Sequence, residues 1–201
     1  LLAPRTEVHD TDATAYRGEV RLLYPASADA ELYIAVAQVR DGANLAVGIP
    51  RLRAAIDKHR PARREFVLEL ADAYVRAGQP ALSIPYYRRA LPLGVRNFAA
   101  ALTGLGRAAE AVEVLKQATD APDLNALGAA LLAMGRAREA AAKLRRAAEI
   151  DPDLPQVHVN LGAALARTGD RIGAVRSLRE AMSSQPDLDR KSTRLNSSHR
   201  T

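Results

Sequence analysis

The sequence predicts an all-α protein, a right-handed α-solenoid of about five antiparallel helix pairs. The first supporting observation is a repeat: the pattern of residues 155–188 also occurs 34 residues earlier, from Ala121. A fixed period of this length is typical of helical repeat arrays. The second is composition, since Ala, Leu and Arg dominate, aromatic residues make up only 4%, and such residues favour helix over strand. One helix pair cannot bury its apolar face alone, so several pairs must stack.

Small and large residues alternate at matched places within residues 121–188. Gly128 and Gly162 lie where a side chain would hold two helices apart. Leu144 and Leu178 are expected to fill the space between the helices. The pattern therefore predicts close helix packing within each pair.

This stretch resembles tetratricopeptide repeats, a family whose pattern spans 34 residues. The matching residues are Leu127-Gly128 and Leu161-Gly162, Ala140 and Ala174, Ala147 and Ala181, and Pro152 and Pro186. His158, Leu165 and Leu178 stand where the family pattern has aromatic residues. The resemblance implies stacked helix pairs whose concave face binds a protein or peptide.

The predicted array spans residues 29–188. Its units are about residues 29–63, 64–91, 92–120, 121–154 and 155–188. AVGIPRLRAAI at 46–56 aligns with ALSIPYYRRAL at 81–91, and Pro50 and Pro85 inside these segments predict a local kink or a late helix start. Units two and three are shorter than 34 residues, and we expect the missing residues to come from the loop after the second helix.

The two ends of the chain differ from the array. Residues 1–28 have no helical period and are interpreted as a linker or the remnant of an upstream domain, since the sequence begins without Met. The run at Thr11-Asp12 faintly resembles the connection from a multihaem cytochrome c-like domain to a repeat array in bacterial proteins, although Ala13 replaces the usual His. Residues 190–201 resemble a translated sequencing-adapter read-through, so 189–201 are interpreted as an artefactual or disordered tail.

The net charge of +6 is not evidence for a nucleic-acid partner. Four basic residues follow Asp189, and removing their charge leaves +2. Nucleic-acid binding by a helical repeat is therefore a weak alternative. No apolar stretch is long enough to cross a bilayer, so no membrane insertion is expected. We expect a soluble protein, either cytoplasmic or periplasmic.

The sequence offers no catalytic, cofactor or metal site. The chain has no Cys, and its four His residues are far apart without metal-ligand spacing. It also lacks a nucleophile elbow, a phosphate-binding Walker motif and a His-Glu-x-x-His motif. We therefore predict that the chain is not an enzyme and binds no cofactor.

The expected binding surface is made mainly by the first helix of each pair. Helical spacing selects the side chains that turn away from the packing stripe. They are Tyr33, Arg40, Glu69, Asp72, Arg76, Arg96, Asn97, Asn125, Gln156, Asn160 and Arg167. Asn can pair with the main chain of an extended peptide, and Arg can hold a carboxylate. The alternative is that many of these side chains only face solvent.

The resemblance to tetratricopeptide repeats implies a scaffold for protein–protein interaction. The alternative is a structural appendage of a larger bacterial protein, with a multihaem cytochrome c-like or other catalytic domain upstream. The last helix, about 171–184, has no predicted partner after it, so Ile172, Val175 and Met182 should leave apolar surface exposed. Self-association through this uncapped helix is a further expectation.

Overall fold

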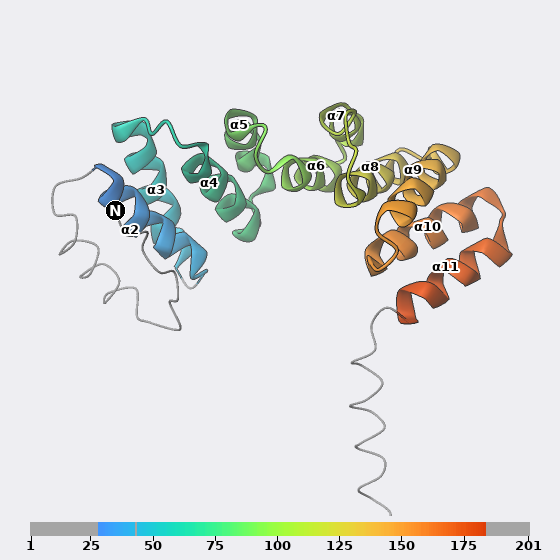
Figure 1. The fold of residues 1–201 in the computed structure, drawn as a ribbon. Coiled ribbons are helices and arrows are strands. Elements are labelled where there is room, and N and C mark those ends of the chain that lie inside the picture. The colour runs from blue at the N-terminus through green and yellow to red at the C-terminus, as the bar shows by residue number, and fades with distance from the viewer. Residues whose placement is uncertain (1–27, 43, 184–201) are drawn as a thin grey trace, which may run out of the picture. The chain divides into compact units, whose positions relative to one another are not determined.

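The computed structural model describes residues 28–42 and 44–183, which form α-helices and no strand (Figure 1). The helices are α2 (Ala28–Arg40), α3 (Leu45–His59), α4 (Arg64–Arg76), α5 (Pro80–Ala90), α6 (Val95–Gly104), α7 (Ala108–Val114), α8 (Ala121–Ala133), α9 (Ala137–Ile150), α10 (Pro155–Thr168) and α11 (Arg171–Ser183). This all-helical architecture confirms the predicted fold class. The predictions for the cytochrome-like run and for the tail lie outside the described residues.

The helices fall into two compact units, which divide between Gly94 and Val95. The first unit holds α2 to α5, and the second holds α6 to α11. Successive helices form the hairpins α2–α3, α4–α5, α6–α7, α8–α9 and α10–α11. Within each unit, the first helices of successive hairpins also contact each other. The hairpins are the predicted helix pairs.

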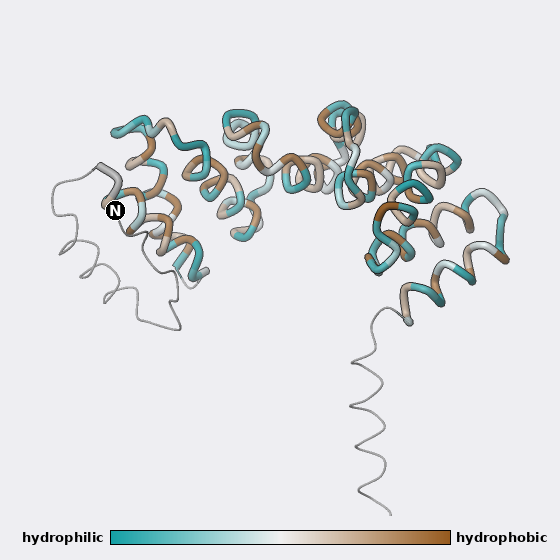
Figure 2. Tube along the Cα trace, viewed as in Figure 1, coloured by the Kyte–Doolittle hydropathy of each residue, from teal (hydrophilic) through white to brown (hydrophobic). Residues whose placement is uncertain are grey.

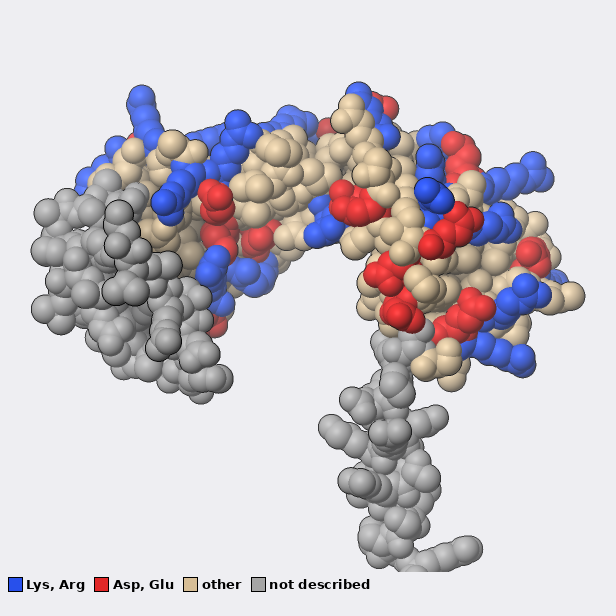
Figure 3. All heavy atoms as spheres, viewed as in Figure 1, with Lys and Arg blue, Asp and Glu red and all other residues tan. Residues whose placement is uncertain are grey.

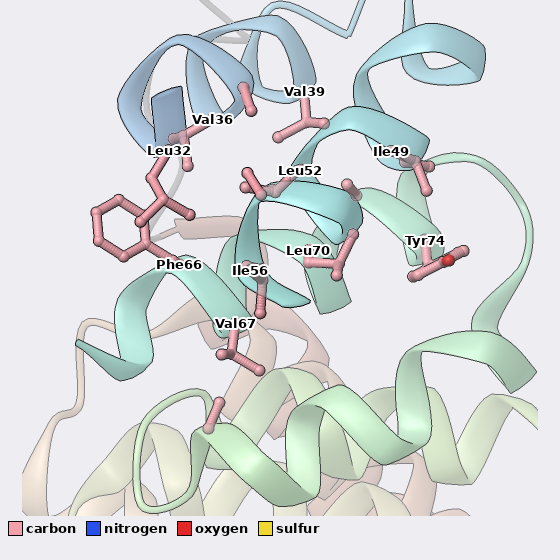
Figure 4. Packing of buried hydrophobic residues seen from close by; sticks show 14 residues of the cluster. Leu32, Val36, Val39, Ile49, Leu52, Ile56, Phe66, Val67, Leu70 and Tyr74 are labelled. Atoms are coloured by element: carbon pink, nitrogen blue, oxygen red, sulfur yellow. The ribbon is translucent and has the colours of Figure 1, made fainter. Parts of the chain in front are cut away.

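The core of the first unit lies between α2, α3 and α4. Figure 4 shows the inward side chains Leu32, Val36, Val39, Ile49, Leu52, Ile56, Phe66, Val67, Leu70 and Tyr74. They recur at helical spacing along each helix, so that one face of the helix is apolar. Hydrophobic segments alternate with hydrophilic ones along these helices in Figure 2. Leu52 and Leu70 are completely buried.

In the second unit the two predicted glycine contacts are present. A Cβ atom on Gly128 would lie 2.5 Å from Leu144 Cγ, and one on Gly162 would lie 2.9 Å from Leu178 Cγ. Both distances are too short for a real contact, which is why glycine is needed there. Leu144 is completely buried as expected, but Leu178 is 43% exposed. Leu178 packs against Gly162 as predicted, but it is not fully buried because no further described helix covers α11.

The two internal prolines do not delay their helices. Pro50 lies inside α3, which begins at Leu45, and Pro85 lies inside α5, which begins at Pro80. The late-start alternative is therefore wrong, while the kink stays a prediction. Both proline rings are exposed, so neither ring disturbs the core.

The third pair is shortened within its helices and not only in a loop. α6 has 10 residues and α7 has 7. After α7 ends at Val114, the Leu115 N–H still donates to Ala111 O at 3.1 Å, and Leu115 is buried. The chain keeps this packing position with turn residues, so a full second helix is not required.

Candidate functional site

A hollow lies between α2 and α4, the first helices of the two pairs in the first unit. We call it the α2–α4 hollow. Its lining residues are Tyr33, Val36, Arg40, Arg63, Glu65, Phe66 and Glu69. Three of them, Tyr33, Arg40 and Glu69, are predicted binding residues. The structure therefore brings part of the predicted surface together at one place.

An aromatic pair forms the apolar wall of the hollow. The rings of Tyr33 and Phe66 have centroids 5.2 Å apart at an interplanar angle of 72°, an edge-to-face arrangement that aromatic rings favour. Phe66 is buried and Tyr33 is exposed. The Tyr33 hydroxyl accepts a hydrogen bond from Arg63 Nη1 at 2.7 Å. The wall thus combines apolar surface with an accessible polar edge.

An ion pair lies across the same hollow. Arg40 Nε donates to Glu69 Oε1 at 2.9 Å, and Arg40 Nη2 contacts the same oxygen. The Arg40 side chain is 66% exposed, whereas that of Glu69 is only 19% exposed. An ion pair this open to water contributes about 0–1 kcal/mol. A ligand carboxylate could therefore share the Arg40 guanidinium at little cost.

Two other predicted residues of the first unit hold helices together. Asp72 accepts a hydrogen bond from the Tyr87 hydroxyl at 2.5 Å. Burial raises the pKa of Tyr87, and the hydrogen bond to Asp72 raises it further, so the phenol stays protonated. Arg76 Nη2 donates to the Val39 carbonyl at 2.9 Å. Neither Asp72 nor Arg76 lines the hollow.

In the second unit, predicted residues connect α8 to α10. Asn160 Nδ2 donates to Asn125 Oδ1 at 2.9 Å. Arg167 Nη1 donates to the Leu132 carbonyl at 2.7 Å, which is the same kind of bond that Arg76 makes in the first unit. These polar groups already have partners within the array, so they stabilise the stacking of successive pairs.

The remaining predicted residues lie on the surface of the second unit. Arg96 Nη1 lies 3.2 Å from Asp123 Oδ1, which joins α6 to α8 by an exposed ion pair. Asn97 and Gln156 are exposed. None of these three predicted residues lines the α2–α4 hollow, and their role in binding stays a prediction.

Arg63, Phe66 and Asp123 are among the residues of these surfaces that sequence reasoning did not select. Arg63 precedes α4 and lies outside the helical periodicity, so the sequence pattern could not indicate that it lines the hollow. Phe66 is one of only two Phe residues in the chain, and this rarity was a usable signal. Asp123 is the acidic residue in the first turn of α8, and its pairing with Arg96 depends on how the two helices stack.

No other chemistry is evident in residues 28–42 and 44–183. These residues contain no group of three or more His, Asp or Glu that could hold a metal ion. None of their helices is both long and apolar enough to cross a membrane. The buried His158 has its Nε2 atom 2.7 Å from the Pro152 carbonyl, which fits a packed side chain.

Two protein-family models match the chain. The model described as tetratricopeptide repeat matches residues 39–101, and the one described as TPR repeat matches residues 126–169. No curated protein is significantly similar to the chain in sequence.

Several solved structures share the fold. One is YrrB, described as a TPR protein with an unusual peptide-binding site, with a TM-score of 0.64 and 19% identity over 90% of this chain and 100% of that chain. MamA from Desulfovibrio magneticus RS-1 has a TM-score of 0.63 and 16% identity over 88% and 97%. BtubC from P. vanneervenii has a TM-score of 0.66 and 18% identity over 88% and 89%. At these identities the likeness shows the fold alone.

Proposed function

We propose that this chain, which carries tetratricopeptide repeats, is a scaffold that binds a segment of a partner protein. The observation that carries the proposal is the α2–α4 hollow, where aromatic surface and charges of both signs meet on the first helices. The peptide-binding site named for the structurally similar YrrB supports the same kind of ligand. A peptide-sized ligand suits a hollow formed between two neighbouring helices.

The lining of the hollow favours a short segment with an apolar side chain and an acidic group. The apolar side chain would pack against Tyr33 and Phe66, as aromatic surfaces supply most of the contact energy in such sites. The acidic group would pair with the guanidinium of Arg63 or Arg40, which present paired donors to a carboxylate. The Tyr33 hydroxyl would form a hydrogen bond with the main chain of the peptide.

The hollow is a poor fit for nucleic acid. Glu65 and Glu69 place two carboxylates within it. A phosphate backbone is recognised by concentrated positive charge, and these carboxylates would repel it. The lining therefore favours a peptide over a polyanion.

The proposal is tested by selecting ligands from a displayed library of random peptides with the full chain as bait. An enriched peptide is synthesised, and its affinity is measured by fluorescence anisotropy. The variants Tyr33→Ala and Arg63→Glu should each weaken binding at least about tenfold, because each removes a contact of the size of a binding hot spot. The control Arg89→Glu changes an exposed arginine of α5 outside the hollow and should leave the affinity unchanged.

One result would contradict the proposed function, and another would contradict only its assignment to the α2–α4 hollow. The first is that no peptide is enriched above background. The second is that an enriched peptide binds both hollow variants as tightly as it binds the unchanged chain. In the second case the scaffold function would stand, and the binding surface would lie elsewhere.

A further inference from the structure

The outer face of α11 carries a stripe of exposed apolar side chains. Ile172 is 79% exposed, Val175 50% and Met182 77%. Their spacing of three and seven residues places all three on one side of the helix. The exposure expected from the sequence is therefore confirmed, and α11 is the last described helix of its unit (Figure 1).

The repeat itself shows what covers such a face. Thirty-four residues earlier, Ala141 and Ala148 of α9 occupy the positions of Val175 and Met182. Ala141 is buried, and Ala148 packs in a cluster with Val157 of α10. The part of the α9 face that matches Val175 and Met182 is thus covered, whereas Arg138, at the position of Ile172, is exposed. The corresponding face of α11 is shaped for a helix, but its larger side chains differ from the alanines that suit another closely stacked repeat.

Three arginines border the apolar stripe. Arg171, Arg176 and Arg179 line a hollow on α11 together with Ile172 and Val175. None of the three forms an ion pair with any residue in 28–42 or 44–183. Figure 3 shows both basic atoms in blue and acidic atoms in red at this end of the second unit. Within the described ranges, this face therefore presents three arginines that form no ion pair, beside apolar surface.

Two acidic residues of the described ranges, on α11 and just before it, contact other groups. Glu180 Oε2 lies 3.2 Å from Nδ1 of the buried His158, so this carboxylate is directed toward α10. Asp170 Oδ1 accepts the Gly173 N–H at 2.9 Å and caps the start of α11. Neither carboxylate belongs to the lining of the hollow on α11.

We propose that the outer face of α11 docks an acidic amphipathic helix of a partner protein. A helix is the occupant because α10 covers the matching face of α9. An acidic helix is favoured because its carboxylates would pair with the three arginines while its apolar side packs on the stripe. A second copy in a symmetric pair would oppose arginine to arginine. Residues 190–201 carry basic residues and no acidic ones, so this stretch of the chain does not complement the face, whereas residues 184–189 carry only Asp187 and Asp189 as acidic groups.

The probe is a helix-stapled peptide of about 14 residues, since shorter free helices are marginal in water. One side carries Leu at helical spacing, and both flanks carry Glu. A matched peptide carries Lys in place of each Glu. Binding of both peptides to the full 201-residue chain is measured by fluorescence anisotropy at low and at high salt.

Two sets of variants separate the local charge from the total charge. The triple variant Arg171→Glu, Arg176→Glu and Arg179→Glu reverses the charge of the face. The control triple Arg89→Glu, Arg138→Glu and Arg145→Glu makes the same change in net charge at exposed positions on α5 and α9. All six positions are exposed, and circular dichroism verifies that both variants are folded.

The proposal expects the Glu peptide to bind at least about tenfold more tightly than the Lys peptide, with the preference shrinking as salt rises. The face-reversed variant should lose this preference or invert it, and the control triple should retain it. Equal binding of the two peptides, or unchanged binding by the face-reversed variant, overturns the proposal.

Two further outcomes assign the face to another occupant and would also overturn it. The first is concentration-dependent self-association in sedimentation that Val175→Ser and Met182→Ser abolish. The second is binding to vesicles with anionic lipid when neither peptide binds. The test is independent of the α2–α4 hollow, because Tyr33→Ala leaves α11 unchanged. Failure here and failure of the proposed function are therefore distinguishable.

Discussion

Replacing Gly128 by Ala tests the close packing of the fourth helix pair. A Cβ atom at this position would lie 2.5 Å from Leu144 Cγ and 2.7 Å from Leu144 Cδ2. Leu144 is completely buried, so its side chain has no free space to enter. Overpacking of this kind costs about 1–3 kcal/mol, and replacing a helical Gly returns about 1 kcal/mol. We expect Gly128→Ala to lower the free energy of unfolding by up to about 2 kcal/mol.

Gly162 is the matched control because it occupies the same place in the last pair. Its Cβ atom would lie 2.9 Å from Leu178 Cγ, but Leu178 is 43% exposed and can turn toward solvent. The gain in helix propensity then offsets most of the remaining strain. Gly162→Ala should stay within about 0.5 kcal/mol of the unchanged chain.

Urea unfolding followed by circular dichroism measures both variants, and Leu144→Ala completes a double-mutant cycle with Gly128→Ala. Alone, Leu144→Ala should cost about 2–5 kcal/mol. Combined with Gly128→Ala it should cost less than the sum, by about 1–2 kcal/mol, because the clash is gone. Equal stabilities for the two alanine variants, or a coupling energy near zero, would refute the steric argument.

The remaining predictions concern single contacts. Tyr87→Phe removes the hydrogen bond to Asp72 and should lower the free energy of unfolding by about 1–2 kcal/mol; an unchanged urea midpoint would contradict this. Hydrogen bonds from basic side chains of α3, with Lys58 the largest contributor, lower the pKa of Glu31 from 4.5. The unchanged chain should therefore be more stable than Glu31→Gln at pH 7, and this difference should disappear as the pH falls below about 4. If urea unfolding gives the same difference in stability at pH 7 and at pH 3, the prediction is wrong. Leu115→Ala should cost about 2–5 kcal/mol in thermal unfolding, since Leu115 is buried, and a loss below about 1 kcal/mol would show that the turn after α7 does not anchor the pair.

The fold was predictable because its main determinants are local and repeated. The period that aligns Gly128 with Gly162 fixes which residues approach a neighbouring helix, and the structure confirms both contacts. The same period could not separate Leu144 from Leu178, which are identical in the pattern. Their burial differs because it depends on whether another helix follows. Position along the array decides exposure, and a repeat pattern contains no such information.

For the candidate site, the sequence could predict which helix face carries it but not which side chains contact each other. Helical spacing selected Asn125 and Asn160 as exposed amides, but the structure pairs them with each other. That pairing depends on how two helices align across successive repeats, a relation that a one-dimensional pattern does not specify. Arg63 lines the hollow from the segment between α3 and α4, where no helical periodicity applies. Side-chain direction could be inferred from sequence, whereas side-chain partners could not.

The guanidinium-to-carbonyl bonds of Arg76 and Arg167 have an evolutionary consequence. Each arginine binds the main chain of the preceding first helix, at Val39 and Leu132, and every residue type provides a carbonyl there. A duplicated or exchanged repeat would therefore find its acceptor ready, without any compensating substitution. The amide pair of Asn125 with its neighbour in α10 demands that two positions change together. Arrays that use the first kind of bond can gain, lose and shuffle units while their junctions keep working.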